Sequence, residues 1–472
     1  MNAPPTPDDH TPGLPIDRRA YQASVQACIH CGLCLPACPT YAETGREADG
    51  PRGRIDLMKA LADGRIKPTD HVVGHLDLCL DCRACETACP SGVQYHQLIE
   101  HTRAALERRP PDRNQRPGAA PRHEPEPEPW RRRRRRGLAD RIGRAVLLHL
   151  MPHPNRLKAA LLPAKLMHRL GLWHALAGPL AERLPGMLAR LPRLAPVDAP
   201  LWPRPTTGRY PALSQRRATV GFFPGCVGSV AHRDLDRKAI DLLRLAGAEV
   251  IVPRAARCCG AIAHHAAEPD PARKLAQRNI EAYDGVAMVV ADIAGCGAML
   301  KQYGELLRDD PDLAQRAASF SAKARDIHQA LAELPLPAPR FAVPAAVAYH
   351  EACHLVHAQG VRDAPRDLLA TIPGLDLRPL DEATMCCGAA GAYNLEQPDM
   401  ADALGDRKAR AVDAAGVDAC ATANVGCAMH LRAALHRLDA DVRVVYPVEL
   451  LHAAHFGGPD ARAPARVNPA RP

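Results

Sequence analysis

The chain has 472 residues, of which 47% are hydrophobic, and this composition predicts globular domains rather than a disordered polypeptide. At roughly 150 residues per domain, the length predicts about three domains. The polar, proline-rich start and the lack of an uncharged apolar run of about 18 residues predict neither a signal peptide nor a transmembrane helix.

Two cysteine runs dominate the first part of the chain, after a short helix expected over residues 21–27. Residues 28–39 and 79–90 both read C-x2-C-x2-C-x3-C-P. In such runs three cysteines bind one [4Fe–4S] cluster and the fourth binds the other cluster, because a short loop reaches only three corners of a cubane. The pattern therefore predicts one cluster held by Cys28, Cys31, Cys34 and Cys89, and a second held by Cys79, Cys82, Cys85 and Cys38.

Zinc is the main alternative for these cysteines, since C-x2-C pairs also form tetrahedral zinc sites. Zinc needs only four thiolates and leaves the paired eight-cysteine pattern unexplained, so we favour two clusters. Cluster ligands must stay reduced, which predicts a cytoplasmic location and disfavours disulfides.

The segment between the runs carries two arginines, Arg52 and Arg54, at the start of a helix expected to reach about Leu61. Positive charge here would raise the potential of a nearby cluster, whereas the simpler interpretation is a solvated helix start. A closing helix is expected over residues 93–107, and a two-cluster domain over residues 1–108.

Residues 109–217 form a predicted connecting region. Alternating Glu-Pro sequence and six arginines at 131–136 contribute to the formal net charge of +9 and are typical of a linker. No aromatic-interleaved basic surface accompanies the arginines, which disfavours nucleic-acid binding. From residue 138, apolar and basic residues alternate in amphipathic segments that prolines at 152, 154, 163, 179 and 185 are expected to cut into short helices. We expect these helices to pack against a partner subunit or across the other domains, and peripheral contact with a membrane is the second option.

The rest of the chain is a duplication. Four cysteines recur at an interval of 127 to 131 residues, which predicts two copies of one domain at 218–338 and 339–460. The first copy carries Cys226, Cys258, Cys259 and Cys296, and the second carries Cys353, Cys386, Cys387 and Cys427. Strands at 219–223, 249–252, 285–291 and 346–349 alternate with helices, which indicates a parallel α/β sheet in each copy.

Ligands bind at the carboxyl ends of such strands, where both sets of cysteines are placed. Each set is therefore a candidate second metal site, redox thiol site or docking surface. Gly260 and Gly388 follow the double cysteines and are expected to let the backbone approach whatever is bound there.

Several neighbouring residues have simpler interpretations. His350 and His354 formally match H-E-x-x-H, but a predicted strand precedes them, which disfavours a zinc protease. The two histidines either support the second-half cysteine site at the ends of the strands or are ordinary loop residues. Cys420 aligns with a strand position and is expected to be a buried apolar thiol. No G-x-G-x-x-G follows a strand, so no flavin or nicotinamide site and no catalytic residue is predicted in this chain.

These motifs resemble a known family. The two-cluster module, the sequences DGPRGRI (49–55) and CPSGVQYH (89–96), and two Cys-Cys-Gly halves together resemble the iron–sulfur subunit of membrane-associated glycolate oxidase. The resemblance covers about residues 20 to 455 and is weakest in the connecting region, which is usually shorter in the family. It implies an α+β/α/β chain: a helical ferredoxin-like module followed by a duplicated parallel α/β domain.

The resemblance also implies a function in glycolate catabolism. Glycolate would be oxidised to glyoxylate on separate FAD-binding subunits, and electrons would pass through this chain to a respiratory acceptor, a quinone. The isolated chain would then be inactive. Three alternatives stay open: a lactate or glycerol-3-phosphate oxidising complex, a heterodisulfide-reductase-like subunit, and a metal-stabilised scaffold without redox function. Met299 and His430 replace the last cysteine of many Cys-Cys-Gly domains, which disfavours the heterodisulfide-reductase-like cluster.

Overall fold

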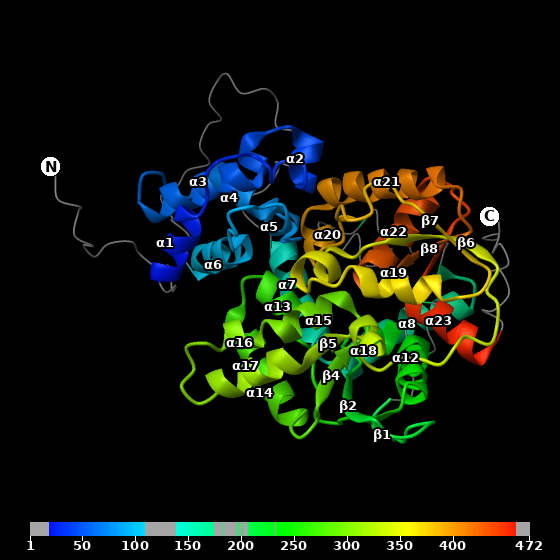
Figure 1. Cartoon of the computed structure of the whole chain (residues 1–472). Helices are drawn as coiled ribbons and strands as arrows, with labels where there is room; N and C mark the ends of the chain where they lie inside the picture. Colours follow the sequence, from blue (N-terminus) through cyan, green and yellow to red (C-terminus); the bar gives the residue numbers. More distant parts are fainter. Residues whose placement is uncertain are drawn as a thin grey trace. The chain divides into compact units, whose positions relative to one another are not determined.

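The computed structural model describes residues 18–108, 138–173, 206–231 and 233–458, with single positions between 174 and 205 (Figure 1). Residues 1–135 and 136–472 form two separate compact units. The predicted Glu-Pro and arginine linker at 109–137 lies outside the described residues.

The first unit is helical where it is described. Its elements are α1 (Arg18–Gln26), α2 (Pro39–Thr44), the 3-10 helix η1 (Glu47–Asp49), α3 (Pro51–Ala62), α4 (Asp70–Asp77), α5 (Ala84–Thr87) and α6 (Tyr95–Arg108). Helices α1, α3 and α6 lie at the three positions that the sequence predicts. Proline begins α2 and α3, where its fixed φ suits the first turn and its missing N–H costs nothing. Met58, Leu76, Leu98 and Ile99 are fully buried and form the core.

Helices α7 (Leu138–Leu150) and α8 (Pro154–Arg169) begin the second unit. The prediction that prolines cut this region into short helices is wrong at Pro163, which lies inside α8. A proline inside a helix removes one N–H donor and bends the helix. The helix can continue through the proline where the turns before and after it are packed against other residues. Lys158 and Lys165, on either side of Pro163, are both buried. The predicted breaks at Pro179 and Pro185 lie outside the described residues.

The first Cys-Cys-Gly half contains a five-stranded sheet in the order β1-β3-β2-β4-β5. Its elements are β1 (Gly208–Tyr210), β2 (Ala218–Phe223), α11 (Gly228–Ala231), α12 (Arg233–Leu245), β3 (Ala248–Val252), α13 (Ala261–His265), α14 (Pro269–Ala282), β4 (Met288–Ala291), α15 (Ala294–Lys301), α16 (Tyr303–Leu306), α17 (Ala314–Lys323), β5 (Ala324–Asp326) and α18 (Ile327–Glu333). Strands β2, β3 and β4 are parallel, as predicted, and β5, which the sequence does not predict, is also parallel. Strand β1 precedes the duplicated sequence and pairs antiparallel with β3, so this sheet is mixed rather than purely parallel.

The second half contains a four-stranded parallel sheet in the order β7-β6-β8-β9. Its elements are β6 (Ala345–His350), the π-helix η4 (His354–Ala358), α19 (Asp363–Ala370), β7 (Leu375–Arg378), α20 (Tyr393–Glu396), α21 (Pro398–Ala414), β8 (Ala419–Thr422), α22 (Val425–Arg437), β9 (Arg443–Val445) and α23 (Pro447–Phe456). Cys420 is fully buried in β8, and burial raises the pKa of its thiol to about 12, which agrees with an apolar core cysteine.

The two halves share one hydrophobic core. Helices α12 and α18 of the first half pack against α23 and α19 of the second, and the four helices lie between the two sheets (Figure 1). A single cluster of buried apolar side chains includes Phe222 of β2 and Val347 of β6. The two copies are therefore fused into one unit rather than linked as independent domains.

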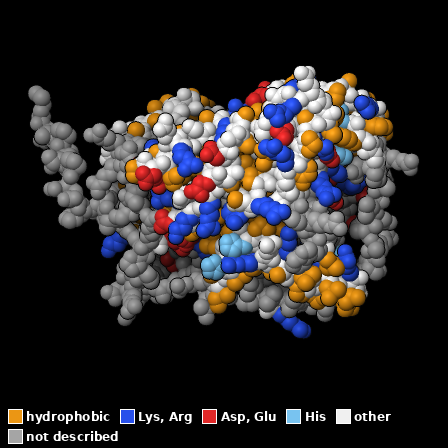
Figure 2. All heavy atoms as spheres, turned by 90° about the horizontal axis from the view of Figure 1, so that it is seen from below, with side chains coloured by type: hydrophobic (Ala, Val, Ile, Leu, Met, Phe, Trp, Pro, Cys, Tyr) orange, Lys and Arg blue, Asp and Glu red, His pale blue; other side chains and the backbone are white. Residues whose placement is uncertain are grey.

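The surface of the described residues is mixed in character. Figure 2 shows Lys and Arg side chains interspersed with acidic and apolar ones on the face that it presents. Among the described residues, no helix combines the length and apolar character needed to cross a bilayer.

Candidate metal centres

The two cysteine runs of the first unit have the same unusual backbone. His30 and Gly32 in the first run have positive φ angles of 58° and 82°, and Asp81 and Arg83 hold the equivalent places in the second with 53° and 60°. A non-glycine residue in this left-handed region costs about 1–2 kcal/mol. Repeating it at the same places winds each loop in the same way. The cysteines of each loop are thereby turned toward a common space.

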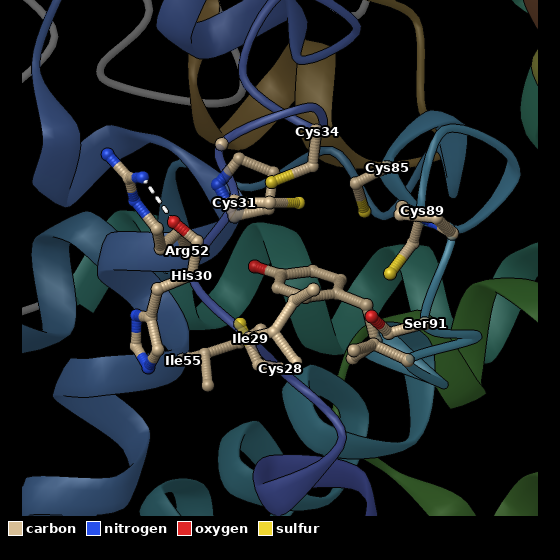
Figure 3. Close-up of a pocket in the computed structure, with 15 residues that line it drawn as sticks. Cys28, Ile29, His30, Cys31, Cys34, Arg52, Ile55, Cys85, Cys89 and Ser91 are labelled. Carbon is tan, nitrogen blue, oxygen red and sulfur yellow. Dashed lines mark hydrogen bonds between the residues drawn. The ribbon is translucent and has the colours of Figure 1, made fainter.

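The first of these spaces is a pocket of about 420 Å³, counting the part open to solvent. Its cysteines are Cys28, Cys31, Cys34, Cys85 and Cys89. Figure 3 shows cysteine side chains from both runs around this pocket. The set includes the four cysteines that the sequence assigns to the first cluster. Cys31 is exposed, and so are the neighbouring Ile29 and Leu33, at 67% and 59%.

The second space is a pocket of about 300 Å³ lined by Cys38, Cys79, Cys82 and Cys85. These are the four cysteines that the sequence assigns to the second cluster, and all four are buried. Pro51, Cys85 and Tyr95 line both pockets, so the two spaces adjoin.

Eight thiols around two adjoining pockets are a donor set that suits two cubane clusters. Burial raises the pKa of the Cys85 thiol well above its usual value, and it also raises the pKa of Cys34. These sulfurs therefore favour the thiol form until a positive metal centre binds them. The residues present fit the group that the sequence predicts.

Arg54 is a buried positive charge beside the second pocket, and it is 1% exposed. Its Nη1 lies 4.0 Å from the Cys38 Sγ, while Nη2 donates to the Thr40 Oγ1 at 3.0 Å. Its Nε donates to the backbone carbonyl of His75 at 2.7 Å. Burial alone would lower the Arg54 pKa, but attraction to Tyr95 and to nearby cysteines raises it, so the side chain stays charged.

Arg52 has a different position on the same helix. Its Nη1 donates to the His30 carbonyl at 2.8 Å, which ties α3 to the first cysteine loop (Figure 3). Its Nε bonds the Glu47 carboxylate at 2.6 Å, and both side chains are partly exposed. Both predicted arginines thus lie beside a cysteine pocket, but Arg54 is buried there, whereas Arg52 is partly exposed and paired with Glu47.

In the first Cys-Cys-Gly half the sulfurs form two close pairs. The Sγ atoms of Cys226 and Cys258 lie 3.3 Å apart, and those of Cys259 and Cys296 lie 3.5 Å apart. Cys226 follows β2, the double cysteine follows β3, and Cys296 lies in the first turn of α15. The topology therefore brings all four sequence-predicted cysteines to the carboxyl end of one sheet.

The second half repeats this arrangement with one addition. The Sγ atoms of Cys353 and Cys386 lie 3.9 Å apart. Cys387 and Cys427 join His350, and their ligand atoms all lie within 4.8 Å of one another. Hydrogen bonds from the thiols of Cys386 and Cys427 hold the pKa of Cys387 well below its usual value, and the nearby His350 side chain adds to this effect. This thiol is therefore favoured as a thiolate.

The glycines after the double cysteines allow a close contact that the sequence did not predict. Gly260 and Gly388 both have φ of 91°, which a side chain rarely adopts. A Cβ on Gly388 would lie 2.5 Å from the Ala401 carbonyl oxygen in α21, and one on Gly260 would lie 3.2 Å from the Ala272 Cα in α14. Both glycines are thus required for close packing against a helix.

The fold also argues against the H-E-x-x-H interpretation of residues 350–354. His350 is the last residue of β6 and His354 begins the π-helix η4, so the two do not share the helix face that an H-E-x-x-H site requires. Met299 and His430 are buried, and the His430 Nε2 lies 2.9 Å from the Ala401 carbonyl oxygen.

Comparison with known proteins agrees with this architecture. Residues 24–93 match the 4Fe-4S dicluster domain family, and residues 220–301 and 347–432 match the cysteine-rich domain family. The probable glycolate oxidase iron–sulfur subunit of Bacillus subtilis is 36% identical over 437 residues, which cover 90% of this chain and 92% of that protein. The chain belongs to the glycolate oxidase iron–sulfur subunit family.

Further relatives show how far the family likeness extends. The glycolate oxidase iron–sulfur subunit of Escherichia coli is 32% identical over 424 residues, covering 88% of this chain and 92% of that protein. Lactate utilization protein A of Oceanobacillus iheyensis is 29% identical, but its 240 aligned residues cover only 51% of this chain. The two glycolate oxidase subunits thus align with nearly the whole of this chain, whereas the lactate utilization protein aligns with about half of this chain.

The sequence placed His350 near the second-half crevice as one of two interpretations, and the structure brings it to Cys387 and Cys427. The duplication gave no further signal for this histidine, because the equivalent residue of the first copy is Phe223. The sequence analysis missed the left-handed backbone at His30, Asp81 and Arg83, although His and Asp are enriched in that region.

Proposed function

We propose that this chain is the electron-transfer subunit of a glycolate oxidase complex. It takes electrons from flavin-binding subunits that oxidise glycolate to glyoxylate and delivers them to a respiratory acceptor, a quinone. The observation that carries the proposal is the pair of adjoining pockets in the first unit, each lined by the four cysteines of one predicted cluster. The family relationship supports glycolate as the substrate of the complex.

The ligand assignment follows the doubled cysteine run. Cys28, Cys31, Cys34 and Cys89 hold one [4Fe–4S] cluster, and Cys79, Cys82, Cys85 and Cys38 hold the other. When bound, the clusters supply one-electron transfer, which couples a two-electron flavin to a chain of single carriers. Only Pro51, Cys85 and Tyr95 line both pockets among the described residues, so the two clusters would be separated by a thin layer of side chains.

The cysteines of the two pockets differ in their exposure to solvent, and this difference suits two roles. Cys31 is exposed and is flanked by the exposed apolar side chains of Ile29 and Leu33, whereas the cysteines of the second pocket are buried. An apolar rim beside an exposed ligand is a suitable contact for a redox partner. The first cluster therefore exchanges electrons with a partner protein, and the second is insulated from water.

Metal analysis of single cysteine variants tests the cluster assignment. Cys31→Ser and Cys82→Ser should each remove one cluster, seen as loss of about half of the iron and acid-labile sulfide after anaerobic purification. Cys420→Ala is the matched control, because Cys420 is a buried core thiol in β8 and should leave the iron content unchanged. Stoichiometric zinc without acid-labile sulfide in the wild-type first unit would refute the assignment.

Electron transfer is tested by reconstitution with the flavin subunits. The chain alone should not reduce a dye with glycolate, because no flavin site is predicted in it. With the flavin subunits present, Cys31→Ser should suppress quinone reduction more strongly than it slows reduction of the flavin by glycolate. Equal loss of both reactions would show that the clusters do not lie downstream of the flavin. Lactate and glycerol-3-phosphate are the substrates to compare, because the flavin subunits select the substrate.

We further propose that the chain is cytoplasmic and contacts the inner face of the cell membrane peripherally. Leu162, Leu166 and Leu170 recur at helical spacing around α8 and are exposed, among basic residues that favour an anionic surface. Sedimentation with vesicles of anionic and of neutral lipids measures this contact. Equal partitioning to both vesicle types would contradict the electrostatic part of the argument.

The proposed domain limits are 1–108, 109–217, 218–338 and 339–460. The ranges that match the two domain families fall inside the first, third and fourth of these segments and support them. In the last two segments, the cysteines of each Cys-Cys-Gly half provide a second thiolate site, for a metal or for redox chemistry. Their role is separate from that of the two clusters.

A further inference from the structure

The second Cys-Cys-Gly half contains a set of nitrogen and sulfur atoms that the first half lacks. His350 ends β6, Cys387 follows β7, and Cys427 lies in the first turn of α22. Their ligand atoms lie within 4.8 Å of one another, and the exposed fractions of the residues are 0%, 1% and 3%. A buried imidazole among sulfurs is a donor set for a metal of intermediate softness.

The imidazole is oriented as metal-bound histidines usually are. Its Nδ1 lies 3.1 Å from the backbone carbonyl oxygen of Ala383, which fixes the ring and leaves Nε2 for the sulfurs. The Nε2 is fully buried and has no hydrogen-bond partner among the described residues. A buried nitrogen of this kind is costly unless another group uses it.

The Cys427 sulfur is also held in place. The Asn424 side chain donates from Nδ2 to the Cys427 Sγ at 3.3 Å, and its Oδ1 accepts from the backbone N–H of Gly295 at 3.3 Å. Asn424 therefore ties this sulfur to α15 of the first half. This second layer of contacts preorganises the ligand before a metal binds.

The first half cannot form the same site, because Phe223 occupies the place of His350. Phe223 is the last residue of β2 and pairs with Ala291 of β4, just as His350 ends β6 and pairs with Thr422 of β8. The Phe223 ring is 1% exposed and packs in the apolar core. The Phe223 ring offers no ligand atom to the four nearby sulfurs, which include the two close pairs described above.

We propose that the second half, and not the first, binds one zinc ion through the His350 Nε2 and the Sγ atoms of Cys387 and Cys427. The Cys353–Cys386 pair, whose sulfurs lie 3.9 Å apart, supplies the fourth ligand. Three thiolates and one imidazole form a closed tetrahedral zinc site that has no redox chemistry of its own. The inference rests on the thiolate role proposed for this half and is independent of the two clusters.

Metal analysis of the full-length chain, purified anaerobically, tests the proposal. Wild type should contain about one zinc per chain in addition to the iron of the two clusters. His350→Phe, which installs the first-half residue, should lose at least about nine-tenths of the zinc and keep its iron and sulfide. Cys296→Ser changes the first-half counterpart of Cys427 and should keep the zinc.

Cobalt provides a readout that does not depend on the stability of His350→Phe. Apo protein titrated with Co²⁺ should bind about one ion with the absorption of tetrahedral cobalt ligated by thiolates, and His350→Cys should restore binding with stronger sulfur-to-cobalt absorption. Zinc retained in His350→Phe, zinc lost equally in Cys296→Ser, or wild type without zinc would overturn the proposal. Iron and sulfide beyond the two clusters, lost in Cys427→Ser, would also overturn it. Because cluster iron is counted separately, failure here does not affect the proposed electron-transfer function.

Discussion

Replacing Arg54 by methionine should lower the reduction potential of the cluster proposed at Cys38, Cys79, Cys82 and Cys85. The Arg54 guanidinium is buried, and its Nη1 lies 4.0 Å from the Cys38 Sγ. A positive charge stabilises the cluster more after it has accepted an electron than before. Methionine has a similar length and removes this charge, so the reduced state loses stabilisation.

The size of the effect follows from the distance. Two unit charges 4 Å apart interact by about 4 kcal/mol at an effective dielectric constant of about 20. The added electron spreads over the whole cluster, and the nearby carboxylate of Asp49 offsets part of the field, so we take roughly half, about 2 kcal/mol. For a one-electron couple, about 1.4 kcal/mol corresponds to 59 mV, which predicts a decrease of about 50–100 mV.

A redox titration followed by electron paramagnetic resonance measures the potential of each cluster separately. Arg54→Lys keeps the charge and should stay closer to wild type than Arg54→Met, which separates charge from the lost hydrogen bonds to Thr40 and His75. Arg52→Gln is the matched control for the second cluster, because Arg52 lines the first pocket only, is partly exposed and paired with Glu47, and should shift the potential of the second cluster much less. An Arg54→Met protein with full iron content and an unchanged potential would refute the reasoning.

Three further outcomes are expected. Gly53→Ala should destabilise the first unit by about 3 kcal/mol in thermal melts, because its Cβ would lie 2.1 Å from the Glu47 carbonyl oxygen, while Gly74→Ala, with no neighbour within 4 Å of a Cβ, should be neutral or stabilising. Burial raises the pKa of Asp292 to about 7, and the Asp326 carboxylate raises it further. The pKa of an aspartate in the unfolded chain is about 4, so the folded protein binds this proton more tightly. The contribution of the proton to the stability of the fold is therefore fully present below about pH 4 and is lost as the pH rises through about 7. The stability advantage of Asp292→Asn over wild type should therefore grow by up to about 3 kcal/mol between pH 5 and pH 8, and a constant difference would contradict this assignment. In the assay with glycolate and a dye, adding the flavin subunits to this chain should start a reaction that neither component supports alone.

The sequence alone determined the features that are defined by the spacing of residues along the chain. The doubled cysteine run predicts which four cysteines gather at each cluster, and the two pockets are lined by these sets, although the ligands themselves stay a prediction. The interval of 127 to 131 residues between matching cysteines indicated the duplication, and both halves form sheets with their cysteines at the carboxyl ends. The break expected at Pro163 failed because packing on both sides of a proline outweighs its local preference.

What only the tertiary structure decided is which side chains from distant segments lie together. His350 in β6 meets Cys387 and Cys427 because parallel strands end at one edge of the sheet, whereas Phe223 turns the equivalent place of the first half into core. Arg54 and Arg52 lie on the same helix, two residues apart, and nothing in the sequence separates the buried charge from the solvated one. The physical reason is that the burial of a side chain, and its distance from other side chains, depend on elements that are far apart in the chain. A motif records only the spacing of its own residues.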